Sequence, residues 1–384
     1  MSDLIRRQSA QNTPIAYTGS AAYTGPAIMG TAWPVGDTLV RDLVLRWSGT
    51  VTVTLGGGAL SVVKQQVARL LAGITFGTDK HKAIVDQGMD GLSLLRMLAI
   101  AAKKDPYYVD IPSTASGPTP FECTFRIPFL DAQGARGWDS VIDLLISQPY
   151  LRHNYNAVGP NTIGTITGGT GSSIVLSNLT MEASLQKYDG PFVDSNGAPA
   201  FPSVAPSLMP YWGLVPNAIT ATQSQAQFDV LYGDRIIKRL FIFSRDSVTN
   251  AERSDIIGQS DNDRVSLTLN GVPILDNVQV RQLMAENVQD YAPATVPAGT
   301  LVLDWHKLFG DGVLRGARVS NDLMLLTPAQ QTVKLKIDVT SQNGGSPSLY
   351  FGYDCYMALP DAAKRPEQLA PKVAAAQNAS KTGK

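Results

Sequence analysis

The feature that most constrains the fold is a strand-like stretch that occurs twice. Residues 36–45 read GDTLVRDLVL, and residues 233–242 repeat that pattern as GDRIIKRLFI. A second pair, VTVTLGG at 51–57 and VSLTLNG at 265–271, follows in the same order. One match between short strands can arise by chance, but two in the same order indicate a duplicated domain. We therefore predict a sandwich-like β domain that the chain encodes twice.

The size and composition of the chain suit two compact domains. With 384 residues it is too long for one ordinary domain, and its 44% hydrophobic content is normal for a globular protein. The 34 glycines and 24 prolines favour many turns between short strands. Lys and Arg together number 32, as do Asp and Glu. Because proteins that grip phosphates usually carry a basic excess, we expect no sequence-specific nucleic-acid partner.

Cysteine usage and the N-terminal residues indicate where the protein is made. Cys123 and Cys355 lie in apolar strand patterns, which favours buried thiols in a reducing compartment, with a disulfide between them as the weaker alternative. Residues 1–7 lack the apolar core of a signal peptide. No apolar run approaches the ~20 residues that span a bilayer. We expect synthesis in the cytoplasm and no integral membrane segment.

Hydrophobic spacing predicts the main elements. Residues 121–127 alternate apolar and polar side chains, which indicates a half-buried strand. Residues 89–104 are apolar and rich in Ala and Leu, which favours a helix over the sheet. Apolar residues between 138 and 145 recur at i, i+3, i+4 and i+7, which predicts a second helix. In the second half we predict strands at 234–243, 265–269, 278–284, 301–305 and 333–339.

These elements and the changes in composition divide the chain into five parts. They are an N-terminal arm (1–35), a first β domain (36–190), a proline-rich packed linker (191–225), a second β domain (226–360) and a basic flexible C-terminal tail (361–384). Neither the arm nor the tail has the apolar periodicity of a domain that folds alone.

The sequence contains no pattern that indicates catalysis. His81, His153 and His306 stand apart, with no spacing typical of a metal site, so each is interpreted as a surface or core histidine. Paired acids of the kind a glycosidase needs occur at Asp131/Asp139, Asp189/Asp194 and Asp261/Asp263. Acidic residues in β-turns are ordinary solvated positions, which is the simpler interpretation. We predict no catalytic residue, no metal site and no cofactor.

The order of these parts resembles that of a known family of viral proteins. The most specific stretch is FDVLYGDRIIKRL at 228–240, supported by the strand at 121–129, the helix predicted at 138–146 and the closing strand at 350–357. In this pattern the chain is similar to the double jelly-roll major capsid proteins of tailless, icosahedral, double-stranded-DNA phages with an internal membrane, the tectivirus-like group. The resemblance implies an all-β fold with minor helices, built as two tandem jelly rolls at 36–190 and 226–360.

The resemblance also implies partners and a location. Three chains would form a pseudo-hexagonal homotrimer that tiles the virion shell beside neighbouring trimers, penton proteins and minor capsid proteins, after synthesis in the host cytoplasm. The terminal arms would run beneath this tile. There they would contact anionic lipid of the inner membrane or a neighbouring subunit through basic residues, namely Arg6, Arg7, Lys364, Arg365 and Lys372.

Two other function classes remain as alternatives. A carbohydrate-binding or carbohydrate-active β-sandwich would need exposed aromatic residues and paired acids around a cleft, whereas the aromatic residues here fall mainly in core-facing rows. A receptor-binding spike would usually show short fibrous repeats and a separate head. We expect a structural shell subunit and no enzyme.

Overall fold

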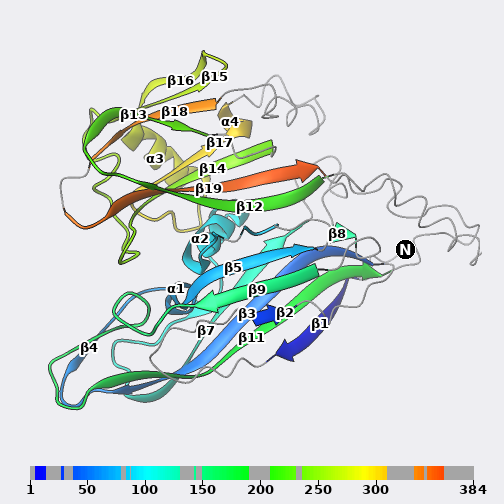
Figure 1. Cartoon of the computed structure of the whole chain (residues 1–384), viewed down its shortest axis with the longest axis vertical. Coiled ribbons are helices and arrows are strands. Elements are labelled where there is room, and N and C mark those ends of the chain that lie inside the picture. Colours follow the sequence, from blue (N-terminus) through cyan, green and yellow to red (C-terminus); the bar gives the residue numbers. More distant parts are fainter. Residues whose placement is uncertain are drawn as a thin grey trace, which may run out of the picture.

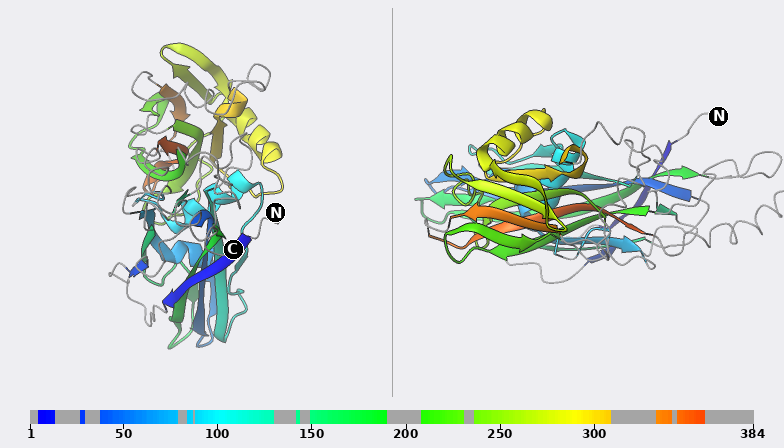
Figure 2. Two further views of the ribbon diagram at one scale, coloured as in Figure 1. Left: turned by 90° about the vertical axis from the view of Figure 1, so that its right-hand side faces the viewer. Right: turned by 90° about the horizontal axis from the view of Figure 1, so that it is seen from above.

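The chain folds into two β-sandwiches that are stacked on each other, with short helices beside the sheets (Figure 1 and Figure 2). The computed structural model describes residues 5–13, 27–29, 38–78, 84–86, 88–129, 142–143, 149–189, 208–230, 236–308, 333–340 and 344–358. The prediction of an all-β chain with minor helices is confirmed.

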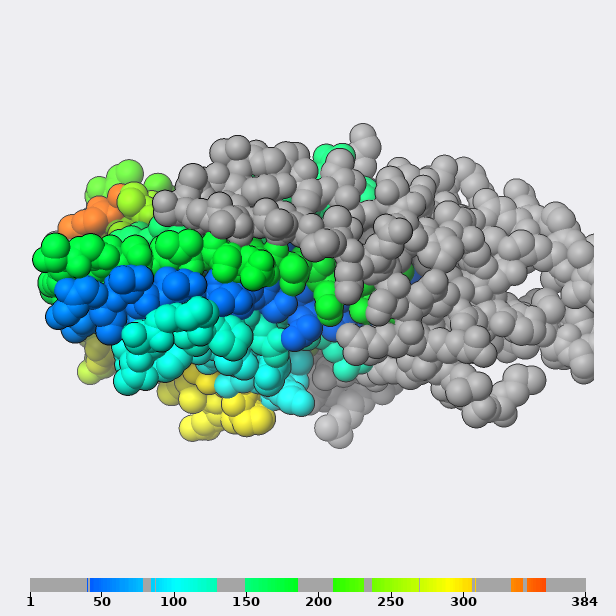
Figure 3. All heavy atoms as spheres, turned by 90° about the horizontal axis from the view of Figure 1, so that it is seen from below, coloured from blue at the N-terminus to red at the C-terminus, as the bar shows by residue number. Residues whose placement is uncertain are grey.

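The first sandwich pairs a large sheet with a smaller one. The large sheet has the order β1 (Ile5–Thr13), β11 (Ser173–Asp189), β3 (Thr38–Thr54), β7 (Gly117–Pro128) and β6 (Tyr108–Val109), and β8 (Ile142–Asp143) also pairs with β3. The smaller sheet has the order β2 (Ala27–Met29), β9 (Pro149–Tyr155) and β5 (Leu71–Thr78), and a separate ribbon joins β4 (Ala59–Val62) to β10 (Gly164–Thr167). Two helices, α1 (Gln66–Leu70) and α2 (Gly91–Ala102), belong to this domain. Figure 3 shows the outer face of the large sheet, with β11, β3 and β7 side by side in green, blue and cyan.

The second sandwich consists of two four-stranded sheets. One has the order β12 (Leu208–Ala218), β19 (Pro347–Ala358), β14 (Ile236–Asp246) and β17 (Thr300–Asp304). The other has the order β13 (Gln223–Asp229), β18 (Val333–Val339), β15 (Arg264–Leu269) and β16 (Val272–Gln279). Helix α3 (Val280–Asp290) connects the two sheets, and α4 (Trp305–Leu308) follows β17.

The two sandwiches repeat the same topology. The order β12-β19-β14-β17 matches β1-β11-β3-β7, and β13-β18-β15 matches β2-β9-β5. Helix α3 follows β16 in the second sandwich, as α2 follows residues 84–86 in the first, so the two helices are also counterparts. The chain is therefore one domain topology used twice.

The two sequence matches that indicated duplication have different outcomes. The described parts of the first match, residues 38–45 and 236–242, fall on β3 and β14, which are counterparts, so this match reflects the duplication. The second match is wrong, because residues 51–54 belong to the same long strand β3, whereas 265–269 form β15, the counterpart of β5. Alternating Val and Thr suits any half-buried strand, so the likeness was one of local composition.

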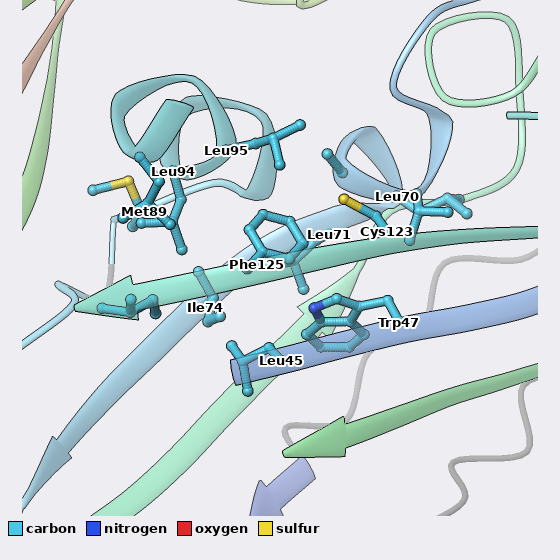
Figure 4. Close-up of a cluster of buried hydrophobic side chains, with 14 of the residues drawn as sticks. Leu45, Trp47, Leu70, Leu71, Ile74, Met89, Leu94, Leu95, Cys123 and Phe125 are labelled. Atoms are coloured by element: carbon cyan, nitrogen blue, oxygen red, sulfur yellow. The ribbon is translucent and has the colours of Figure 1, made fainter. Parts of the chain in front are cut away.

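Alternating side chains explain why each sandwich has its own core. On β7, Phe121, Cys123, Phe125 and Ile127 are buried, while the residues between them face outward. Figure 4 shows Trp47 of β3, Phe125 of β7 and Leu95 of α2 pointing toward one centre in the first sandwich. In the second, Leu240 and Ile242 of β14 meet Leu335 and Ile337 of β18 in a separate cluster.

Parts of the predicted arm and linker are strands of the sandwiches, so those domain boundaries need correction. Within 1–35, β1 pairs with β11 and β2 pairs with β9. Within 191–225, β12 pairs with β19 along its whole length, and β13 begins at Gln223. These strands lack clear alternation, and β12 contains Pro210 and Pro216. Edge strands tolerate proline because one side of the backbone needs no ladder hydrogen bond.

Two predicted elements have the wrong type. Of the helix predicted at 138–146, only Ile142 and Asp143 are described, and they form β8 beside Val40 and Leu39. The strand predicted at 278–284 is the end of β16 and the start of α3. Val280, Leu283, Met284 and Asn287 recur at helical spacing and face the sandwich, so the helical signal was present in the sequence.

The helix predicted at 89–104 is confirmed as α2. Asp90 caps it, because its carboxylate accepts a hydrogen bond from the Ser93 backbone N–H at 2.8 Å. The helix ends at Ala102, and the left-handed backbone of its C-cap residue Lys103 turns the chain away before Pro106.

The sequence allowed a surface or a core position for each histidine. His153 of β9 lies in the core of the first sandwich. Its ring meets the edges of Trp47 and Tyr155 at centroid distances of 5.0 and 5.3 Å. Neither ring nitrogen has a hydrogen-bond partner in the described part of the chain. Burial lowers the pKa of His153 from 6.5 to about 4, since the charged ring would lose its hydration.

We predict that His153 makes the fold acid-sensitive. Between pH 6.5 and about 4 the unfolded chain binds a proton at this ring and the folded chain does not. The free energy of unfolding should therefore fall with decreasing pH, by up to about 1.4 kcal/mol per pH unit. Urea unfolding at several pH values in this range should show that the free energy of unfolding falls less steeply with decreasing pH in His153→Phe than in the wild type. An unchanged slope in that variant would show that the ring does not carry the effect.

Candidate functional site at the junction of the two sandwiches

A short extended segment joins the two sandwiches through backbone hydrogen bonds. On one side, the Val85 N–H donates to the Phe76 carbonyl of β5 at 2.9 Å. On the other side, the Trp212 N–H of β12 donates to the Ile84 carbonyl at 2.7 Å, and the Asp86 N–H donates to the Trp212 carbonyl at 2.9 Å. Through this segment the β2-β9-β5 sheet of the first sandwich is joined to the β12-β19-β14-β17 sheet of the second.

Helix α2 fills the space beside this segment, between the two sandwiches (Figure 1). Every residue from Gly91 to Ile100 is buried, and Leu94, Leu95, Met97, Leu98 and Ile100 belong to the apolar cluster of the first sandwich. Phe241 and Phe243 of β14 pack into the same apolar cluster as α2. At Gly352 of β19 a Cβ atom would lie 2.7 Å from the Met97 sulfur, so a larger residue there would push the end of the Met97 side chain aside.

The junction also contains a buried ion pair. Arg245 of β14 is fully buried, and its guanidinium lies 3.4 Å from both carboxylate oxygens of Asp90 at the start of α2. It also donates a hydrogen bond to the Ser93 hydroxyl, and it lies 4.3 Å from the centre of the Tyr350 ring. Burial raises the pKa of Asp90, but the Arg245 charge and the Ser93 hydrogen bonds outweigh it, and the net shift is downward. The carboxylate is therefore held ionised.

A second pair crosses the same junction one helical turn further along. Arg96 of α2 is buried and forms an ion pair with Glu252, which follows β14. Burial lowers the pKa of Arg96 to about 10, which still leaves it charged at neutral pH. Arg69 of α1 donates to the Asn250 carbonyl at 3.2 Å. The junction is thus apolar at its centre and ionic at its edge.

A third charged group lies on the same sheet of the second sandwich. Arg239 of β14 donates to Asp304 at 3.2 Å and to Asp354 at 2.8 Å. The Tyr291 hydroxyl donates to Asp304 at 3.1 Å. Burial opposes the charge of Arg239, but the two carboxylates raise its pKa above the ordinary value. These contacts fix three strands of one sheet to each other and to the end of α3.

The structure places only some of the residues expected to contact membrane or neighbours. Arg6 and Arg7 lie in β1, where they pair with Lys187 and Gln186 of β11. Lys364, Arg365 and Lys372 lie outside the described residues. The two groups are therefore not brought together in the described part of the chain, and their roles remain predictions.

The polar residues singled out for chemistry have structural partners where they are described. Asp261 forms an ion pair with Arg281 at 2.7 Å, and the Asp263 carboxylate accepts the Ser260 N–H at 3.0 Å. Cys123 and Cys355 are buried and form no disulfide, and burial raises the pKa of Cys123. No group of three His, Cys, Asp or Glu within the described ranges could hold a metal ion. None of the described helices is long and apolar enough to cross a membrane.

Several solved structures are similar to this chain in their architecture. The STIV MCP aligns at 16% identity with a TM-score of 0.63, over 94% of this chain and 99% of the other. A chain from the structure of Sulfolobus Turreted Icosahedral Virus aligns at 16% identity and TM-score 0.64, over 98% of both chains. The major capsid protein P2 of bacteriophage PM2 aligns at 11% identity and TM-score 0.54, over 93% of this chain and 98% of the other.

The fold is a double jelly roll. The likeness covers both jelly rolls and the junction, and the prediction of two tandem jelly rolls is confirmed. No family model matches the sequence, and no curated protein matches it either. Identities this low carry the fold alone.

The junction of the double jelly roll was not predicted from the sequence. Arg245 and Asp90 are far apart in the chain, and each sits in a segment that looks ordinary by itself. The available signal was the composition of α2, which is apolar on all faces apart from Ser93 and Arg96. A helix of that kind must be covered on every side, so the sequence could have indicated a helix between two domains.

We predict that Arg245→Met destabilises the protein because Asp90 then keeps a partly buried charge without its cation. The free energy of unfolding should fall by about 2–4 kcal/mol, measured by urea denaturation at one protein concentration. Adding Asp90→Asn should cost less than the two single changes together, since the residues act as a pair. Arg281→Met, at an exposed ion pair, should change stability by less than about 1 kcal/mol. Equal losses in the two arginine variants would contradict a special role for the junction pair.

Proposed function

We propose that the protein is the major capsid protein of an icosahedral virus. The observation that carries this proposal is the likeness of the whole chain, both jelly rolls and their junction, to viral capsid proteins over nearly their full lengths. The three chains are described as the STIV MCP, a chain of Sulfolobus Turreted Icosahedral Virus and the major capsid protein of bacteriophage PM2. The buried thiols and paired acids of the described residues are consistent with a structural role.

The subunit assembles as a homotrimer with a pseudo-hexagonal outline. Two domains of the same topology in one chain give six similar blocks in a trimer, which suits a tile that packs in a plane. Neighbouring trimers, penton proteins and minor capsid proteins complete the shell of a tailless double-stranded-DNA phage. In this proposal the protein resides in the virion after synthesis in the host cytoplasm.

We expect the purified chain to be a trimer. Size-exclusion chromatography with light scattering should give three times the chain mass of 41.1 kDa. Negative-stain images should show hexagonal outlines. A monomer whose melting temperature rises with a bound sugar would favour a carbohydrate-binding protein instead, and an elongated trimer with a separate head would favour a receptor-binding spike.

The basic residues at the two ends serve contact with an inner membrane or a neighbouring subunit. Arg6 and Arg7 lie on β1, and the tail carries Lys364, Arg365 and Lys372 against two acidic residues, Asp361 and Glu367. Near an anionic membrane each basic side chain contributes about 1 kcal/mol.

We expect the tail to bind anionic lipid. Replacing Lys364, Arg365 and Lys372 by Ala should reduce flotation with phosphatidylserine vesicles, and high salt should reduce it in the wild type. Vesicles of neutral lipid provide the matched control. Unchanged flotation with a still intact trimer would assign these residues to a neighbouring subunit or to neither role.

A further inference from the structure

A lysine and an aspartate on neighbouring strands of the second sandwich face each other in a buried position. Lys238 lies on β14 and Asp354 on β19, and these strands are side by side in one sheet (Figure 1). The Lys238 Nζ is 3.8 Å from the Asp354 Oδ1, and the exposed fractions of the two side chains are 12% and 1%. The Nζ also lies 4.5 Å from the centre of the buried Tyr356 ring. The amine and the carboxylate therefore meet largely out of contact with solvent.

A β-bulge brings Lys238 to this carboxylate. The ladder of β14 and β19 shifts register between Ile237 and Arg239, so Lys238 is an extra residue on β14. In a regular strand consecutive side chains point to opposite faces, and only one of Lys238 and Arg239 could reach Asp354. The bulge lets both side chains contact the same carboxylate.

The first sandwich has the same bulge without this pair of residues. Its ladder of β3 and β11 shifts register next to Asp42, where Arg41 is the extra residue on β3. Gln186 pairs with Asp42, so it holds the place that Asp354 has in the second sandwich. The bulge therefore belongs to the shared domain topology and does not require a lysine that faces an aspartate. The pair of Lys238 and Asp354 is a separate feature of the second sandwich.

The two carboxylate oxygens of Asp354 have different surroundings. Arg239 donates a hydrogen bond to Oδ2 at 2.8 Å. Oδ1 is buried and has no hydrogen-bond partner among the described residues, since the Lys238 Nζ at 3.8 Å is beyond hydrogen-bond length. A buried ion pair is stable only when hydrogen bonds satisfy its charges, and Oδ1 lacks them. Oδ1 is therefore the oxygen that faces the amine and that no described hydrogen bond holds.

We propose that Lys238 and Asp354 condense to an isopeptide bond that joins β14 to β19. A proton first passes from the Lys238 ammonium to Oδ1, which converts the ion pair to a neutral amine and a neutral acid. The Nζ then forms a bond to the Cγ of Asp354, and the bond between Cγ and Oδ1 breaks. Oδ1 leaves as water with the transferred proton and a second proton from the nitrogen. Atoms and charges balance without an oxidant, a reductant or a further reactant.

Arg239 and the buried setting favour this reaction. As the Nζ adds to Cγ, negative charge develops on Oδ2, which the Arg239 guanidinium already contacts. Arg239 also donates to Asp304 at 3.2 Å, and this contact holds the guanidinium in place while Asp354 reacts. Two groups that the fold holds close together react without the entropic cost of meeting. The product is a neutral amide, which costs less to bury than two charges.

The bond joins the two central strands of the β12-β19-β14-β17 sheet. Most of the second sandwich lies between Lys238 and Asp354 in the chain, so the bond closes a long loop. A covalent link across a long loop lowers the entropy of the unfolded chain and so stabilises the folded one. This property goes beyond the proposed function and does not depend on it, because it concerns a single chain.

The mass of the intact chain tests the bond directly. The purified wild-type chain, unfolded in denaturant, should be lighter than its sequence by the mass of one water molecule. Lys238→Arg keeps the positive charge but removes the amine, and this variant should have its full mass. Lys336→Arg is the matched control, since Lys336 is exposed on β18, and it should keep the mass deficit. A wild-type chain at its full sequence mass would overturn the proposal.

A tryptic digest locates the bond. Residues 236–239 should remain joined to residues 337–364 in one branched peptide, because trypsin does not cut at a lysine whose amine is part of an amide. Water is also lost where an aspartate cyclises before a glycine, as at Asp189, but that loss would persist in Lys238→Arg. A deficit that persists in Lys238→Arg, or a wild-type digest in which all of the 236–238 peptide is released, would contradict the bond.

The same samples separate this proposal from the proposed function. Light scattering reports the oligomeric state, whereas the mass and the digest report the bond within one chain. A trimer at its full sequence mass would overturn the isopeptide bond and leave the capsid role standing. A monomer with the mass deficit and the branched peptide would support the bond and count against the capsid role.

Discussion

Backbone hydrogen bonds at residues 84–86 extend a sheet of the first sandwich into the second, and α2 is buried against the surface that results. A helix that is apolar on nearly all sides is stable only when all of its sides are covered. Each domain without the other would therefore expose apolar side chains to water. Arg245 adds a further condition, because a buried guanidinium is costly unless its carboxylate partner lies beside it. Apolar packing joins the domains, and the ion pair with Asp90 fixes how α2 lies on the sheet.

Local patterns predicted those parts of the fold that a single strand can encode. The alternation around Phe125 gave β7, and the likeness of 36–45 to 233–242 located β3 and β14, which lie at the same place in their sheets. The likeness of 51–57 to 265–271 failed because alternating Val and Thr describes any half-buried strand. A repeat is therefore better supported by the order of strands in the sheets than by the sequence of one strand.

The strands that were not predicted correctly are those that tertiary contacts specify and that show no alternation of buried and exposed side chains. β1 and β12 are edge strands held by backbone pairing, so neither needs a buried row, and β12 can contain Pro210 and Pro216. β8 consists of two residues whose pairing with β3 no local pattern specifies. The junction residues were also beyond sequence reasoning. Asp90 and Arg245 interact only when the two domains bring them together.

Comparison of the two halves shows how one domain plan serves two environments. Where the internal junction has Phe243 and Met97, the corresponding open surfaces have Arg46 and Glu286. A contact within one chain forms once during folding and can be apolar, because its two surfaces are never free at the same time. Arg46 and Glu286 are exposed in the single chain, and exposed positions favour charged side chains. The two halves therefore share one topology and diverge in their side chains at these positions, because protein covers the positions in one half and solvent reaches them in the other.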